Sequence, residues 1–191
     1  MRAILYGLLF LVAAGIGYVA FDWYAKMGSG EAYGDAFVLV DQKGQPITEK
    51  EFRAQPSAGV FGFIHCPEIC PTTLFELDGW LNQLGAEGEN IRAFFVSVDP
   101  ERDTPEIMDQ YVSNVSKRIT GVTGDPAKVA AMAKSFNIYS RRVDPGDGEY
   151  TMDHPASVLL LEKGGAFAGT IAYGENAQAA IAKLKRLAAG S

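Results

Sequence analysis

Cysteine is scarce in this chain: two of its 191 residues are cysteines, Cys66 and Cys70, and both lie in one short segment. Small secreted domains that need covalent stapling contain several disulfides, whereas a chain of this length buries a sizeable core of its own. A disulfide between residues four positions apart would also close almost no loop, so it would constrain the unfolded chain little. The scarcity argues against a structural disulfide and leaves a redox dithiol or a metal site.

The chain also lacks an excess of positive charge. It has 17 lysines and arginines against 23 aspartates and glutamates, which gives a formal net charge of -6. No basic stripe interleaved with aromatic residues is present in the sequence, and this argues against a nucleic-acid partner. The cluster of Lys183, Lys185 and Arg186 fits the last turn of a helix, where cations complement the helix dipole.

Charge is missing altogether from Ala3 to Phe21. A helix of this length spans roughly 28 Å, close to the hydrocarbon thickness of a bilayer. The run is longer than the apolar region of a signal peptide, so we interpret residues 1–21 as an uncleaved membrane anchor rather than a cleaved signal. Because Arg2 precedes the run, the positive-inside rule predicts a single-pass protein of the inner membrane with its globular part on the periplasmic side. Residues 22–36 are rich in glycine and read as a linker.

Apolar periodicity predicts strands alternating with helices from residue 37 onward. Strands are expected within segments 36–47, 59–65, 91–99, 119–124, 156–162 and 166–172. Helices are expected within segments 71–85, 103–118, 125–138 and 175–189, with Pro71, Thr104 and Asp125 at their starts. This order predicts an α/β sheet with helices on both faces. A cysteine pair between a strand and a helix favours a thioredoxin-like fold, here with an N-terminal transmembrane helix.

The spacing of the two cysteines allows both sulfurs to act together. Residues i and i+4 face the same side of a helical turn, so the sulfurs can approach one ion or each other. Cys70 directly precedes the expected helix start at Pro71, and the positive end of the helix dipole is expected to lower the pKa of its thiol. Pro67 and Pro71 stiffen the loop that holds the sulfurs.

Histidine is as scarce as cysteine, with His65 and His154 alone. His65 precedes Cys66 at the end of a strand, and we interpret it as a structural residue rather than a ligand. His154 lies just before a late strand, where a thioredoxin-like fold would bring it beside the cysteine loop; Asp153 is expected to orient its imidazole. Two thiolates and one imidazole are three ligands, fewer than a structural zinc site uses, so copper, as Cu(I) or Cu(II), is favoured over zinc.

Three blocks of the sequence closely resemble the Sco/SenC family of membrane-anchored, thioredoxin-like copper proteins. They are "GFIHCPEICPTTL" at 62–74, "VSVDPERDTPEIMDQY" at 96–111 and "YTMDHPASVLLLEKGGAF" at 150–167. The resemblance implies a copper-binding domain over residues 37–191, with Cys66, Cys70 and His154 as ligands and Asp99 near the copper loop. It also implies a role in assembling the dinuclear copper centre in subunit II of cytochrome c oxidase.

Two functions follow, and a third is less favoured. The first is a metallochaperone, a binding protein rather than an enzyme, that exchanges copper with subunit II and with other copper chaperones. The second is a thiol–disulfide oxidoreductase that reduces partner cysteines through a redox disulfide between Cys66 and Cys70, works with other thiol reductants and needs no metal. A thiol peroxidase of related fold would need one low-pKa cysteine with a nearby arginine, and it would not need His154.

Overall fold

The computed structural model describes residues 15, 17, 30–144, 146 and 148–190. The chain divides into two units, residues 1–31 and 32–191, and the second contains the sheet and all the elements named below. The predicted anchor at 1–21 lies outside the described residues except for Gly15 and Gly17, and so does most of the predicted linker. Within the described part, no helix is both long and apolar enough to cross a membrane.

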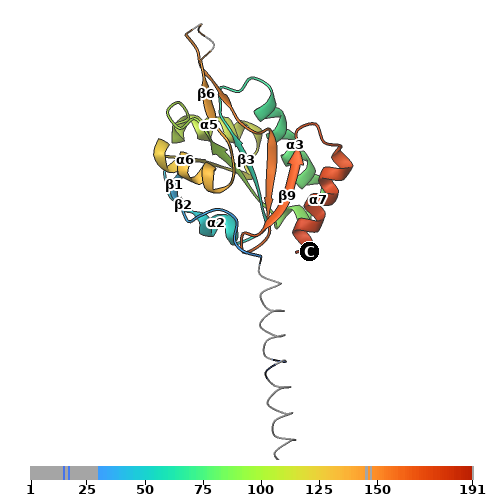
Figure 1. Ribbon diagram of the computed structural model, residues 1–191. Coiled ribbons are helices and arrows are strands. Elements are labelled where there is room, and N and C mark those ends of the chain that lie inside the picture. The colour runs from blue at the N-terminus through green and yellow to red at the C-terminus, as the bar shows by residue number, and fades with distance from the viewer. Residues whose placement is uncertain (1–14, 16, 18–29, 145, 147, 191) are drawn as a thin grey trace, which may run out of the picture. The chain divides into compact units, whose positions relative to one another are not determined.

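A mixed seven-stranded sheet forms the centre of the second unit (Figure 1), in the order β2-β1-β5-β4-β3-β8-β9. Its strands are β1 Val38–Asp41, β2 Pro46–Thr48, β3 Ser57–Gly62, β4 Arg92–Ser97, β5 Ile119–Thr123, β8 Ser157–Leu161 and β9 Phe167–Ala172. The three central strands β3, β4 and β5 are parallel, and their neighbours on both sides are antiparallel. The predicted hairpins β1–β2 and β8–β9 are confirmed.

Helices cover both faces of this sheet, as predicted. They are α2 Glu49–Arg53, α3 Ile69–Gln83, α4 Ala86–Glu89, α5 Pro105–Val115, α6 Pro126–Ser135 and α7 Ala177–Ala189. Successive residues of β4 point to opposite faces: Phe94 stacks on Phe52 of α2, with ring centroids 3.8 Å apart, whereas Phe95 packs against Tyr111 of α5. Figure 1 shows α3 and α7 on one side of the sheet and α6 on the other.

The capping signals placed two helix starts correctly and one wrongly. Thr104 and Asp125 cap α5 and α6, and both helices begin with proline. The helix predicted to begin at Pro71 begins instead at Ile69, so Cys70 lies inside its first turn. Pro71 is compatible with this because the first-turn amides of a helix have no partner within the helix.

The sequence pattern missed a two-stranded hairpin that lies apart from the main sheet. Its strands are β6 Arg141–Val143 and β7 Thr151–Asp153, which pair antiparallel. Each has three residues and none is buried, so neither shows the apolar alternation that marks a strand. Because β7 ends directly before His154, this hairpin determines where the imidazole lies.

The compact unit begins earlier than the predicted boundary at Phe37. Ala32 forms a β-bridge with Ala166, and the Tyr33 amide donates to the carbonyl of Gly165 at 2.8 Å. The Tyr33 ring also packs edge-on against Phe136. The last residues of the segment assigned to the linker, 32–36, therefore belong to the domain.

Candidate metal centre

The predicted site residues meet at the carboxyl ends of the parallel strands. The loop that contains Cys66 follows β3, and the loop from Asp99 to Asp103 follows the parallel neighbour β4. Open α/β sheets place ligand sites at this edge, because loops from adjacent parallel strands converge there. The β6–β7 hairpin brings His154 to the same edge from a distant part of the sequence.

The two sulfurs and one imidazole nitrogen form a compact group. Cys66 Sγ, Cys70 Sγ and a ring nitrogen of His154 all lie within 4.8 Å of one another, and Cys70 Sγ is 3.7 Å from His154 Nε2. Both cysteines are free thiols and buried, while His154 is half-buried. A single ion placed between the three atoms could reach each of them after small side-chain movements. The predicted convergence of these three residues is therefore present in the structure.

Backbone geometry holds the sulfurs together. The amide of Cys70 donates to Cys66 Sγ at 3.4 Å, which is a consequence of the i, i+4 spacing across the first turn of α3. Behind Cys70 lies Gly62, the last residue of β3. A Cβ added at Gly62 would lie 2.7 Å from Cys70 Sγ and 2.9 Å from the Phe95 ring, so only glycine leaves room for this sulfur. Gly62 is a site residue that sequence reasoning did not single out.

The imidazole is oriented by a backbone carbonyl and not by Asp153. His154 Nδ1 lies 3.1 Å from the carbonyl oxygen of Pro155, which can only accept a hydrogen bond. With the proton on Nδ1, the lone pair of Nε2 faces the sulfurs and is available to a metal. Asp153 is 54% exposed and lies 3.9 Å from Arg141 across the hairpin. The Phe63 ring meets the imidazole edge-on, with centroids 5.6 Å apart.

The predicted lowering of the Cys70 pKa is wrong. Burial raises the pKa of the Cys70 thiol from 9.0 to about 12, and the neighbouring Cys66 and Asp103 add to the rise. The side chain is 1% exposed, because it points from the first turn of α3 toward the sheet. A rise of this size corresponds to about 4 kcal/mol, whereas a helix dipole contributes at most about 2 kcal/mol. The effect of desolvation is therefore larger than that of the helix dipole. Without a bound metal ion, the Cys70 thiol is protonated at neutral pH.

The site opens to solvent on the side of Cys66. A hollow of about 350 Å³ is bordered by Cys66 and His154, and Phe63, Ile69 and Met152 give it an apolar wall. Ile69 is exposed at its rim. A second protein could therefore approach the site from this side, while Cys70 lies at the back. His65 is exposed and outside the ligand group, in agreement with its interpretation as a non-ligand.

A buried carboxyl group lies behind the cysteine loop. Asp103 is 0% exposed and accepts hydrogen bonds from the Ser97 hydroxyl at 2.6 Å and from the Ile64 amide at 3.3 Å. It thereby fixes the strand-to-loop transition that leads to Cys66. Burial raises the pKa of Asp103 from 3.8 to about 6, although both hydrogen bonds act in the opposite direction.

This elevated pKa predicts how the stability of the protein depends on pH. Folding favours the protonated carboxyl group, so its contribution is full below pH 4 and is lost as pH rises through about 6. The free energy of unfolding of wild type, relative to Asp103→Asn, should fall by about 2 kcal/mol between pH 4 and pH 7. Urea unfolding of both proteins across this range measures the difference. Parallel pH profiles would show that burial does not perturb this carboxyl group.

Comparisons with known proteins agree with this geometry. The family model described as SCO1/SenC matches residues 25–189. The mitochondrial protein SCO2 of Saccharomyces cerevisiae is 33% identical over 158 residues, which are 81% of this chain and 52% of that protein. The mitochondrial SCO2 homolog of Mus musculus is 33% identical over 165 residues, which are 85% of this chain and 63% of that protein. The chain thus spans between half and two thirds of the length of these curated relatives.

Two solved structures extend the likeness to three dimensions. The structure of Bradyrhizobium japonicum ScoI with copper bound superposes with a TM-score of 0.74 at 40% identity, covering 82% of this chain and 99% of that one. Yeast Sco1 with copper bound gives a TM-score of 0.72 at 31% identity, covering 81% of this chain and 87% of that one. The thioredoxin-like α/β fold predicted for the domain is confirmed. With the family model matched over most of its length, this chain belongs to the SCO1/SenC family.

Proposed function

We propose that this protein is a copper-binding assembly factor that holds one copper ion between Cys66, Cys70 and His154. The observation that carries the proposal is the grouping of two sulfurs and one imidazole nitrogen within 4.8 Å at the open edge of the sheet. Soft thiolates select Cu(I), and an imidazole extends the set to Cu(II). The copper-bound ScoI and Sco1 structures support the same cargo for this fold.

Three ligands suit a protein that passes its metal on. A structural site closes all coordination positions with protein atoms, whereas a three-ligand site leaves a position for an incoming donor. The hollow beside Cys66 and His154 gives a partner's thiols access to that position. We propose that the recipient is the dinuclear copper site in subunit II of cytochrome c oxidase, which the family resemblance implies. The domain would act on the periplasmic side of the inner membrane, anchored by residues 1–21.

Transfer can be measured directly. The protein is loaded anaerobically with one equivalent of Cu(I) and mixed with the reduced, copper-free soluble domain of subunit II. After separation, copper should be found on the subunit II domain and the thiols of Cys66 and Cys70 should remain reduced. Copper that stays entirely on the donor, or that the donor fails to retain against a weak competing chelator, would contradict the proposal.

A second function is favoured by the proximity of the two sulfurs. Cys66 and Cys70 could be oxidised to a disulfide while a disulfide of the partner is reduced, so that two electrons and two protons pass to the partner. The same mixture, prepared with oxidised subunit II and without copper, tests this alternative. A Cys66–Cys70 disulfide that appears together with free thiols on the partner would support it. Thiols that stay reduced on this protein, with the partner's disulfide intact, would exclude it.

A further inference from the structure

A stack of three side chains fastens the β6–β7 hairpin to the loop after β4. The Tyr150 ring lies between two guanidinium groups: the Cζ of Arg102 is 3.6 Å from the ring centroid, and the Cζ of Arg142 is 3.7 Å from it. Arg142 belongs to β6, while Arg102 belongs to the loop between β4 and α5. Cations over an aromatic face are attracted by the electron-rich ring. The stack therefore joins two segments that are about forty residues apart.

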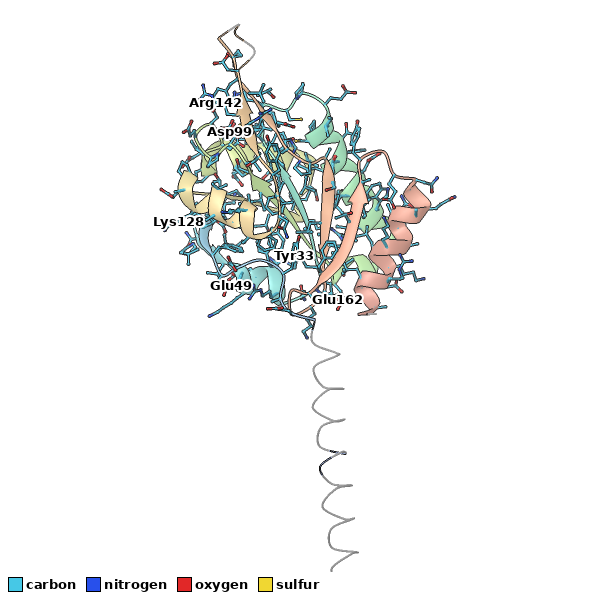
Figure 2. All side chains as sticks on the ribbon, in the orientation of Figure 1. Tyr33, Glu49, Asp99, Lys128, Arg142 and Glu162 are labelled. Atoms are coloured by element: carbon cyan, nitrogen blue, oxygen red, sulfur yellow. The ribbon has the colours of Figure 1, made fainter. Side chains whose placement is uncertain are left out.

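A buried carboxylate anchors this stack to the sheet. Asp99 is 4% exposed, follows the end of β4, accepts a hydrogen bond from the Tyr150 hydroxyl at 2.8 Å and pairs with Arg102 Nε. Arg102 Nη1 also donates to the backbone carbonyl of Tyr150 at 3.0 Å. The ring, the hydroxyl and the backbone of Tyr150 are thus all held by one loop. Figure 2 shows Asp99 and Arg142 close together at the upper part of the domain.

Two contact routes lead from this cluster to the imidazole. Along the chain, Tyr150 directly precedes the three residues of β7, and His154 directly follows them. Through space, the Arg102 guanidinium lies 5.9 Å from the centroid of the Phe63 ring, and Phe63 packs edge-on against His154. A displacement of Arg102 would therefore act on both the strand before His154 and the ring beside it.

We propose that Arg102 and Tyr150, anchored on Asp99, are positioning residues that present the His154 imidazole to the two sulfurs. No residue of strands β6 and β7 is fully buried; Met152 packs partly buried against the core, and Arg142 lies 4.0 Å from the exposed Glu101. The stack is the contact that holds Tyr150, at the start of β7, by its ring, its hydroxyl and its backbone. A ligand that spends only a fraction of its time in the binding position lowers the apparent metal affinity by that fraction. This inference rests on the proposed three-ligand copper site and adds the residues that hold its third ligand in place.

A double-mutant cycle separates positioning from a general structural role. Copper affinity is measured by chelator competition for wild type, Tyr150→Ala, His154→Ala and the double variant, and Cu(II)-loaded samples are compared for nitrogen coupling by electron paramagnetic resonance. Tyr150→Ala should weaken binding roughly ten- to a hundred-fold, as is typical of residues that orient a metal ligand, and should reduce the nitrogen coupling. In the His154→Ala background the same substitution should have no further effect.

Two milder variants test the parts of the cluster. Tyr150→Phe keeps the ring between the guanidinium groups and loses only the hydrogen bond to Asp99, so its loss of affinity should be smaller than that of Tyr150→Ala. Arg102→Lys loses the planar guanidinium group that bonds Asp99 and the Tyr150 carbonyl at the same time. Its loss of copper affinity should therefore be similar to that of Tyr150→Ala. Phe75→Ala removes a 72% exposed ring from α3 and serves as the control, with wild-type affinity expected.

Each outcome of the cycle supports or overturns one statement. Wild-type affinity in Tyr150→Ala, or an equal loss with and without His154, would overturn the positioning role. A His154→Ala protein that binds copper as wild type does would instead overturn the three-ligand site itself. If Tyr150→Ala unfolds, Arg142→Ala removes only the outer layer of the stack, and its effect should also vanish in the His154→Ala background; a persisting loss would overturn the inference.

Discussion

Replacing Cys70 with alanine should abolish retention of Cu(I) and prevent any disulfide within the chain. Cys70 Sγ lies 3.7 Å from His154 Nε2 and within 4.8 Å of Cys66 Sγ, so it is close to both of the other ligand atoms. Removing it leaves one thiolate and one imidazole, which is a poor set for a soft ion. The loss of affinity should exceed the 10–100-fold typical of residues that merely orient a ligand.

Titration with a chromophoric Cu(I) chelator under anaerobic conditions measures this loss. Cys66→Ala is the matched variant, because it removes the other sulfur and leaves the thiol of Cys70 in place. Circular dichroism of both variants checks that the fold is retained. Copper held by Cys70→Ala with wild-type affinity would mean that the ion binds outside the group described here.

Replacing His154 with alanine should weaken the binding of Cu(II) more than that of Cu(I). The two thiolates remain in place, and Cu(I), the softer ion, keeps two of its three preferred donors. Cu(II) depends more on imidazole nitrogen, so the loss of Nε2 removes the ligand that suits it best. Parallel titrations with the two ions, using the same protein preparation, give the two changes in affinity.

His65→Ala is the matched control for this substitution. His65 is next to Cys66 in sequence but is exposed and lies outside the ligand group, so its removal should leave both affinities at the wild-type value. Equal losses in the two histidine variants would point to a general change of charge or fold. A loss in His65→Ala alone would show that the third ligand is His65 and not His154.

Most of the sheet could be predicted from sequence because its strands are buried and leave strong signals. Apolar runs such as 91–99 and 156–162 correspond to β4 and β8, and the proline starts after Thr104 and Asp125 placed α5 and α6. The spacing of the two cysteines alone indicated that their sulfurs can act together. His154 required in addition the expectation that a late strand of a thioredoxin-like sheet begins beside the cysteine loop.

The remaining features of the site depend on contacts that no local pattern encodes. The pKa of Cys70 was predicted from its position at a helix start, but its direction is decided by burial against Gly62 and the sheet, which the local sequence does not show. In the loop after β4, the local sequence shows only the helix start at Thr104, which the structure confirms. Arg102 was missed because its partner Tyr150 lies 48 residues later, on a short exposed hairpin.

X-ray absorption at the copper edge of the Cu(I)-loaded wild-type protein tests the three-ligand site most directly. Two sulfur neighbours and one nitrogen neighbour are predicted, and the nitrogen contribution should be missing from His154→Ala measured under the same conditions. A first shell of sulfur alone in wild type, or a spectrum that His154→Ala leaves unchanged, would contradict the site described here.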